Sequence, residues 1–314
     1  MKKPSLSLSV KSAVGGVQTE EKGGLMQKDK SFHAYFYILP MFFFFIVFLI
    51  YPLFNTVWLS FHEWNGFDPD LKFAGLQNYV EMFHDEVFYK AFSNFAIYAV
   101  LVILLEMLLG FSLAYLMRKP CKIYTLYKAV IFIPVILLPI VISYIFQDIL
   151  SYQYGFVNVM LRKIGLGGLA LDWLADPKVA LYTLIGITVW SGTGFSMSVY
   201  ASSLTSFPNE LIEAAELDGA GKFQIVTKIV WPLLRGTHFS LSIISAISAL
   251  KIFDLVYLLT GGGPFHSTEM PSTYMYSNAF TLYKQGYASA VATIIIIFAL
   301  IVTFIQLRLS SAKK

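Results

Sequence analysis

Residues 204–236 read LTSFPNELIEAAELDGAGKFQIVTKIVWPLLRG, a polar and amphipathic stretch between two strongly apolar runs in the second half of the chain. The stretch predicts two short helices with a turn at Gly219 between them, because glycine often follows the last residue of a helix. Ser206 can cap the first helix, and Pro208 suits its opening turn. On the second helix, helical spacing predicts one apolar face that consists of Phe223, Val226, Ile229 and Val230. A structured polar segment between two apolar runs is typical of a docking surface.

The composition is that of a membrane protein. The 314 residues are 57% hydrophobic and 17% aromatic, and only 13% are charged, whereas about a quarter of the residues of a soluble domain are charged. The single cysteine, Cys121, excludes an internal disulfide framework and argues against a metal–thiolate site. The formal net charge of +4 comes from basic residues beside apolar runs, which favours contact with membrane lipid over nucleic acid.

Six apolar runs are long enough to cross the roughly 30 Å of hydrocarbon in a bilayer. The sequence therefore predicts an all-α membrane protein with six transmembrane helices. Residues 1–33 lack the apolar core of a signal peptide, and we expect them to form a disordered tail before one transmembrane domain, residues 34–314. The six spans are placed near 35–57, 92–116, 126–148, 179–201, 231–256 and 288–309.

The distribution of Lys and Arg predicts the orientation of the chain. Sixteen of the 23 basic residues fall in both termini, in 117–128 and in 202–235, and seven fall in the segments between. Because short cytoplasmic loops are enriched in Lys and Arg, the N- and C-termini and the stretch at 204–236 are expected on the cytoplasmic side. Segment 58–91 is then outside, and so is 149–178, which predicts a short lateral helix near 157–164.

Residues 213–232, EAAELDGAGKFQIVTKIVWP, resemble the EAA loop of ABC importer permeases. That family pattern is Glu-Ala-Ala, three residues, Gly, nine residues, Ile, one residue and Leu-Pro. Trp231 stands where leucine is usual and Gly236 where a second proline is common, which puts the exact start of the following span in doubt. The resemblance implies the type I ABC importer permease fold, with a coupling loop at 204–232. It also implies contact with an ATPase through Glu213, Ala214, Ala215, Asp218 and Gly219.

A second resemblance narrows the substrate class. Residues 258–269, LLTGGGPFHSTE, are similar to the Thr-Gly-Gly-Gly-Pro…Thr-Glu segment of the carbohydrate-uptake permeases of the maltose, multiple-sugar and glycerol-phosphate type. The resemblance implies that the cargo is a sugar, an oligosaccharide or a glycerol-phosphate-like polyol. The three glycines by themselves are equally compatible with a tight external turn that has no ligand role.

The same resemblance implies a set of cargo-binding residues in the membrane. Carried over without gaps, the sugar-contacting positions of the maltose-type permease fall on three spans. The fourth-span set shares one helix face, and its hydroxyls, bare backbone and aromatic ring suit a sugar. Small and hydroxyl residues also mark packing between transmembrane helices, so that interpretation stays open. The positions are Thr188, Ser191, Gly192 and Phe195 in the fourth span, Ser245, Ala249 and Ile252 in the fifth, and Val135 and Pro139 in the third.

The resemblance also implies partners. They are a second homologous permease subunit, two cytoplasmic ATPase subunits that carry ATP and Mg²⁺, and an extracellular sugar-binding protein. This chain then acts as a multi-pass transport subunit of the cell membrane and holds no cofactor of its own. Residues 219–222, Gly-Ala-Gly-Lys, do not form a phosphate loop, because Glu216 replaces the first glycine and Phe223 replaces the Ser or Thr that would bind Mg²⁺. We therefore expect no ATPase site in this chain and no enzymatic activity.

Two polar features of the spans leave alternatives open. Glu106 lies near the middle of the second predicted span, where an ionisable group is costly unless it faces protein or water. It is either a hydrogen-bonded residue inside the helix bundle or a proton relay in a secondary transporter. Lys251 and Asp254 are spaced to form a local ion pair on one helix face, or else contact a polar substrate. A non-transporting membrane scaffold is the third class that the sequence allows.

Overall fold

The computed structural model describes residues 37–118, 124–206, 208 and 210–311, so the predicted tail at 1–33 lies outside the described residues. The chain divides into two compact units, of which the first ends at Phe54 and the second begins at Asn55. The described part of the first unit belongs to one apolar helix, Tyr37–Leu59, which contains the π-helical segment η1 (Ile46–Ile50) and α2 (Tyr51–Leu59).

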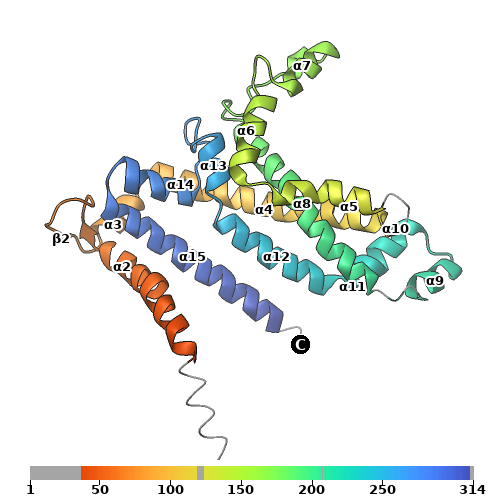
Figure 1. The fold of residues 1–314 in the computed structure, drawn as a ribbon, viewed down its shortest axis with the longest axis horizontal. Coiled ribbons are helices and arrows are strands. Elements are labelled where there is room, and N and C mark those ends of the chain that lie inside the picture. The colour runs from red at the N-terminus through yellow and green to blue at the C-terminus, as the bar shows by residue number, and fades with distance from the viewer. Residues whose placement is uncertain (1–36, 119–123, 207, 209, 312–314) are drawn as a thin grey trace, which may run out of the picture. The chain divides into compact units, whose positions relative to one another are not determined.

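The second unit is almost wholly helical (Figure 1). Its long helices are α4 (Glu86–Leu116), α8 (Ala180–Thr205), α12 (Arg235–Leu250) and α15 (Gln285–Ser311). The shorter elements are β1 (His62–Glu63), β2 (Lys72–Phe73), α3 (Gln77–Met82), α5 (Tyr124–Phe132), η2 (Ile133–Ile136), α6 (Pro139–Ile149), α7 (Phe156–Lys163), η3 (Gly167–Leu169), α9 (Glu210–Leu217), α10 (Lys222–Ile225), η4 (Val226–Val230), α11 (Trp231–Leu233), α13 (Asp254–Leu259), α14 (Pro271–Tyr276) and η5 (Ser277–Thr281). A short helix, expected near 157–164, is present as α7.

Three of the described helices are long and apolar enough to cross a membrane, and the number rises to five if two bent helix pairs are each one span. The three are Tyr37–Leu59, Glu86–Leu116 and Gln285–Gln306. The predicted span at 179–201 is present as α8, with 26 residues. Its many Gly, Ser and Thr residues make α8 less apolar than the other spans, and six spans are therefore not established by length and hydropathy.

Two predicted spans are not straight helices. The run at 126–148 is bent by 100° between Thr125–Ile136 and Pro139–Ile149. Leu138 is extended there, with ψ at 143°, because the residue before a proline is driven out of the helical region. The run at 231–256 is bent by 67° before Arg235, and its helix α12 already ends at Leu250.

Segment 58–91, which is expected on the outer side, contains a small hairpin that the all-helical prediction missed. Strands β1 and β2 pair antiparallel, with His62 opposite Phe73 and Glu63 opposite Lys72. Each strand has two residues, which is too short to produce a readable alternation of polar and apolar positions. The buried Asn78 side chain fixes the hairpin, because its Nδ2 donates to the carbonyls of Ser60 at 2.8 Å and His62 at 3.0 Å.

Helix α4 packs chiefly against α8, and small residues allow the close approach. A Cβ placed on Gly110 would lie 2.7 Å from the Cβ of Ser196 and 2.9 Å from the backbone nitrogen of Met197. A Cβ on Gly192 would collide with the carboxylate of Glu106. Glycine and serine at such crossings are characteristic of helix packing in membranes.

The two ends of α4 belong to different buried clusters. Near its N-terminus, Phe88 packs in one cluster with Tyr274 of α14 and Tyr287 of α15. Near its C-terminus, Phe111 belongs to another with Ile212 of α9 and Ile225 of α10. The 31 residues of α4 correspond to roughly 46 Å at ~1.5 Å per residue. The outer segment and the 204–232 loop therefore lie at opposite ends of the unit, as the predicted topology requires (Figure 1).

Asp85 caps α4 and accepts hydrogen bonds from several donors. Its Oδ1 accepts from the backbone N–H of Val87 at 2.8 Å, and its Oδ2 accepts from the hydroxyls of Tyr274 and Tyr287. Burial by itself raises the pKa of Asp85, but the hydrogen bonds from Tyr274, Val87 and Tyr287 outweigh it and hold the pKa below its ordinary value.

This lowered pKa makes the stability of the Asp85 region depend on pH. The carboxylate stabilises the fold fully above the unfolded-state pKa of about 3.9. The contribution is lost as pH falls through the lower folded-state pKa. We expect Asp85→Asn to be less thermostable than wild type at pH 7, with a difference that narrows below about pH 4. Thermal unfolding in detergent from pH 7 to pH 3 measures this, and a difference that stays constant over that range would contradict it.

Candidate functional site

The turn at Gly219, which is predicted to take part in coupling, is a regular C-terminal end of helix α9. Gly219 has φ of +81°, its N–H donates to the carbonyl of Glu216, and the N–H of Ala220 donates to the carbonyl of Ala215 at 2.9 Å. These two bonds and the left-handed glycine make a Schellman motif, which satisfies carbonyls at the end of α9. The prediction that Gly219 ends the first helix of the loop is confirmed.

The residues expected to couple to an ATPase lie on an accessible surface. Ile212 is only 4% exposed and packs into the cluster that also contains Tyr200 of α8 and Leu241 of α12. Helix α9 is thus anchored by its apolar side to both neighbouring long helices. Of the predicted coupling residues, Ala215 is half-buried against this cluster, while Glu213, Ala214, Asp218 and Gly219 are exposed.

Two details of the loop differ from the prediction. Ser206 is the C-cap of α8, and α9 begins only at Glu210, so Ser206 does not cap α9. Phe223 is 79% exposed and does not belong to the apolar face of the second helix. That face consists of Ile225, Val226, Ile229 and Val230. The π-helical segment η4, Val226–Val230, departs from the 3.6-residue repeat on which the predicted spacing rests, and Phe223 lies outside the buried face.

Two large apolar residues of the loop point into solvent. Leu217 is 89% exposed and Phe223 is 79% exposed, and they lie on either side of the Gly219 turn. Large apolar side chains that a loop leaves exposed on both sides of a turn are candidates for contact with a partner. The sequence contained a signal for both, because large apolar residues flank a turn glycine in a loop expected in the cytoplasm. The apolar face predicted from helical spacing includes Phe223, and its exposure corrects that prediction.

The fourth-span set lies along one side of α8. Thr188, Ser191 and Gly192 are half-buried and Phe195 is 39% exposed, whereas Val189, Thr193 and Ser196 of the same helix are buried. The hydroxyl of Thr188 accepts a hydrogen bond from Tyr98 of α4 at 3.2 Å. The hydroxyls of Thr188 and Ser191 also donate to α8 carbonyls, at 3.0 and 2.9 Å. Part of this polar face is therefore already paired within the chain.

Glu106 joins two of the predicted cargo positions. One carboxylate oxygen, Oε2, accepts a hydrogen bond from Ser245 of α12 at 3.0 Å. The other, Oε1, occupies the place where a Cβ on Gly192 would lie. Glu106 and Ser245 are 8% and 7% exposed. The buried carboxylate therefore connects α4, α8 and α12, which agrees with the interpretation of Glu106 as a hydrogen-bonded residue inside the bundle.

Removing the Ser245 hydroxyl should destabilise the bundle. Ser245→Ala leaves Glu106 without its described donor, and an orphaned buried polar group costs about 1–3 kcal/mol. We expect a lower temperature of thermal unfolding in detergent. The matched control is Ser242→Ala, because Ser242 is on the same helix and donates only to the carbonyl of Phe239. Equal unfolding temperatures for the two variants would contradict a structural role for the Glu106–Ser245 bond.

The remaining predicted cargo positions lie elsewhere. Ala249 and Ile252 line a small apolar cavity with Phe95 and Phe298. Val135 lies against α8, because a Cβ on Gly194 would come within 2.9 Å of its Cγ2. Pro139 begins α6, and its carbonyl accepts a hydrogen bond from Ser143 at 2.8 Å. Among the described contacts, Gly192 and Ser245 both lie against Glu106. Ala249, Ile252, Val135 and Pro139 do not share that contact.

The predicted Lys251–Asp254 pairing on one helix face is wrong. Helix α12 ends at Leu250 and α13 begins at Asp254, with Phe253 at φ −141° and ψ −62° between them. Lys251 is the C-cap of α12 and Asp254 is the first residue of α13, so the two residues do not share one helix face. Over the part of the chain that the structure describes, the ion pairs are Lys284–Glu81 and His266–Glu269.

The glycine turn after α13 has a packing role. Gly261 and Gly262 have φ of +60° and +88°, and a Cβ on Gly262 would lie 2.5 Å from a carboxylate oxygen of Glu269. Glu269 is buried, and its carboxylate accepts from Thr273 at 2.7 Å. Asn94 of α4 donates to the carbonyl of Glu269 at 3.0 Å. These contacts hold the turn against α4 and account for its glycine content.

Comparison with known proteins identifies the family. Residues 106–314, about two-thirds of the chain, match the family described as "binding-protein-dependent transport system inner membrane component". The chain is 36% identical over 282 residues to the probable ABC transporter permease protein YurN of Bacillus subtilis, covering 89% of this chain and 96% of that protein. It is 29% identical over 281 residues to the trehalose/maltose transport system permease protein MalF of Thermococcus litoralis, covering 90% and 94%.

A solved structure has the same fold. A chain of a bacterial ABC transporter involved in the import of the acidic polysaccharide alginate superposes with a TM-score of 0.79 at 23% identity, covering 91% of this chain and 98% of that chain. The multiple sugar-binding transport system permease protein MsmF of Streptococcus mutans is 30% identical over 265 residues, covering 84% and 90%. This chain therefore belongs to the family of binding-protein-dependent transport system inner membrane components and is a multi-pass ABC transporter permease of the cell membrane.

Proposed function

We propose that this chain is the membrane-spanning permease subunit of an ATP-driven sugar importer and forms half of the translocation pathway. The trehalose/maltose and multiple sugar-binding systems named for its relatives support a carbohydrate cargo. The observation that carries the proposal is the exposed, rigidly ended helix α9, which is anchored to α8 and α12 through Ile212.

The proposed complex contains four kinds of component. This subunit pairs with a second homologous permease, two cytoplasmic ATPase subunits bind ATP and Mg²⁺, and an extracytoplasmic binding protein delivers the sugar. A periplasmic protein accompanies the alginate transporter in a second solved complex that resembles this chain, with a TM-score of 0.77. That likeness is one of fold alone, and the partners of this chain remain part of the proposal.

Coupling follows from the packing of the loop. Closure of the ATPase subunits would press on α9 and the Gly219 turn. Since Ile212 shares a buried cluster with Tyr200 of α8 and Leu241 of α12, displacement of α9 moves both helices as a unit. Small rigid-body movements of packed helices are sufficient to open and close a pathway between them. The cargo would contact the accessible side of α8 around Ser191 and Phe195.

Reconstitution tests the function. The chain, its partner permease and the ATPase subunits are purified together and placed in lipid nanodiscs. We expect ATP hydrolysis to rise several-fold when the sugar-loaded binding protein is added. A proton-coupled transporter that uses Glu106 would show uptake that is independent of ATP and abolished by ionophores. A scaffold would show neither uptake nor stimulated hydrolysis, so each outcome selects one class.

The exposed apolar pair of the loop gives a sharper test of coupling. We expect Leu217→Ser and Phe223→Ser together to reduce co-purification of the ATPase about tenfold, the effect of roughly 1.4 kcal/mol at an interface. Thermal stability of the permease should be unchanged, because both side chains are exposed. Lys222→Ser, next to Phe223, is the matched control. Normal recovery of the ATPase with the double variant would contradict docking at this surface.

A further inference from the structure

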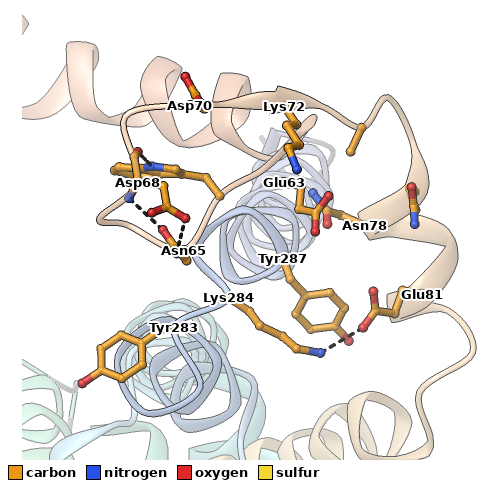
Figure 2. Close-up of a pocket in the computed structure, with 13 residues that line it drawn as sticks. Glu63, Asn65, Asp68, Asp70, Lys72, Asn78, Glu81, Tyr283, Lys284 and Tyr287 are labelled. Carbon is orange, nitrogen blue, oxygen red and sulfur yellow. Dashed lines mark hydrogen bonds and ion pairs between the residues drawn. The ribbon is translucent and has the colours of Figure 1, made fainter.

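A cavity of about 340 Å³ opens between the β1–β2 hairpin, α3 and the start of α15 (Figure 2). Neither the cargo positions nor the coupling loop contributes to it. Its volume is in the range of sites that hold a small molecule or a protruding side chain. The charged residues that line it are Glu63, Asp68, Asp70, Glu81, Lys72 and Lys284.

The cavity walls are held in place by backbone contacts. The N–H of Gly286 donates to the carbonyl of Trp64 at 3.1 Å, and a Cβ on Gly286 would collide with the carbonyl of His62. The start of α15 therefore lies directly against the hairpin. Asn78 fastens the hairpin to α3 from the other side through its Nδ2. The cavity is thus formed by fixed elements.

One end of the cavity already binds an internal cation. Lys284 Nζ lies 3.1 Å from Glu81 Oε1 and 5.6 Å from the centroid of the Tyr287 ring. Figure 2 marks the Lys284–Glu81 ion pair with a dashed line beside Tyr287. A carboxylate beside an aromatic ring is a favourable environment for an ammonium or guanidinium group. Both side chains of the ion pair are 53% exposed, and the contact shows that an ammonium group fits beside Glu81 and Tyr287.

The rest of the cavity offers similar chemistry with unpaired acids. Asp68 accepts from Asn65 at 2.7 Å. The carboxylates of Glu63 and Asp70 have no hydrogen bond or ion pair with any residue that the structure describes. Lys72 is opposite Glu63 in the hairpin, and the described ion pairs do not include it. Four carboxylates against two amines leave the lining with an excess of negative charge.

The side-chain amide of Asn78 adds to the two unpaired acids. Asn78 is 7% exposed and lines the cavity, and both hydrogens of its Nδ2 are used by backbone carbonyls. Its Oδ1 accepts no hydrogen bond from the described residues, so it remains available to a donor in the cavity. Trp64 contributes an aromatic ring to the same lining. Carboxylates, an amide oxygen and a ring together suit a group with several N–H donors.

The position of the cavity indicates where this group comes from. It lies at the α3 and α14 end of α4, opposite the coupling loop, which is the predicted outer side. We propose that the cavity receives an arginine or lysine side chain of the extracytoplasmic binding protein and so guides the docking of that protein. The inference rests on the proposed function, because only an importer of this kind has such a partner. Charge complementarity of this kind mainly raises the rate of association and makes it depend on salt.

The test compares two double variants with the same change in charge. Glu63→Gln with Asp70→Asn neutralises the cavity. Asp148→Asn with Asp172→Asn neutralises two exposed acids outside the cavity, one near the end of α6 and one in segment 149–178, and serves as the control. Each complex is reconstituted in nanodiscs and titrated with the sugar-loaded cognate binding protein at about 20 and 200 mM salt. Salt screens the attraction between exposed charges weakly at the lower concentration and strongly at the higher one. The readout is the concentration of binding protein that gives half-maximal ATP hydrolysis.

We expect the cavity variant to need about tenfold more binding protein at low salt, with an unchanged maximal rate and a flattened salt dependence. The control should differ from wild type by less than about twofold. Equal half-maximal concentrations for the cavity variant and the control would overturn the inference. So would a weaker response to the sugar with unaltered affinity for the binding protein, which would make the cavity a cargo site. A wild-type complex that does not respond to the binding protein overturns the proposed function itself, and this inference with it.

Discussion

Gly110→Val should prevent normal packing of α4 against α8 and strongly reduce the yield of folded protein. A Cβ at position 110 would lie 2.9 Å from the backbone nitrogen of Met197 and 2.7 Å from the Cβ of Ser196. A backbone atom cannot rotate away as a flexible side chain can, so the helices must separate. Overpacking of this kind costs typically about 1–3 kcal/mol, and a β-branched residue is the most demanding case. Thermal unfolding of the detergent-solubilised protein measures the loss.

The control for this prediction is Gly186→Val on α8. A Cβ there has no heavy atom within 4 Å, so valine adds volume without a collision in this chain. Gly110→Ala should fall between wild type and Gly110→Val, because it adds one carbon instead of three. If Gly110→Val and Gly186→Val unfold at the same temperature, the close approach of α4 and α8 does not limit stability.

Gly219→Val should abolish uptake while membrane insertion and the rest of the fold persist. Gly219 has φ of +81°, where a side chain costs roughly 1–2 kcal/mol per residue, and a β-branched residue is the least suited. No heavy atom lies within 4 Å of a Cβ at this position. Valine therefore disturbs the turn and the surface offered to the ATPase, and it does not clash with this chain. The measurement is uptake of radiolabelled sugar, together with the amount of protein in the membrane.

Asparagine supplies the matched control at this position. Gly219→Asn adds a side chain but tolerates the left-handed conformation far better than valine does. We expect Gly219→Asn to retain substantial uptake if backbone geometry is what matters. Loss of uptake in both variants would indicate instead that the ATPase requires a bare backbone at 219. Normal uptake with valine would contradict the assignment of this turn to coupling.

Much of the architecture was predictable because it depends on local patterns. Long apolar runs marked α4 and α15, and Gly219 ended α9 because a glycine relieves the cost of the left-handed residue there. The hairpin at 62–73 was not predictable, because its two-residue strands exist only through Asn78 and the contact with Gly286. The break after Leu250 was also missed, since no proline or glycine marks it.

The candidate sites also divide into features that the sequence predicted and features that depend on contacts between distant segments. The positions expected to bind cargo rest on resemblance. In the structure, Ser245 and Gly192 lie against Glu106. Ser191 and Phe195 are accessible on α8. The outer cavity had no signature at all in the sequence. Its acids come from 63–81 and its internal lysine from position 284. Their meeting depends on how α15 returns to the hairpin.

The sequence by itself determined that this protein is an apolar helical permease with a glycine-ended helix in a polar loop. Hydropathy, charge bias and helix-end chemistry depend on residues that are close together in the chain. They can therefore be recognised from the sequence alone. Only the tertiary structure decided the partners of Glu106, the exposure of Phe223 and the charged lining of the outer cavity. Each of these depends on contacts between segments far apart in the chain, and their geometry is set by close packing of the helices.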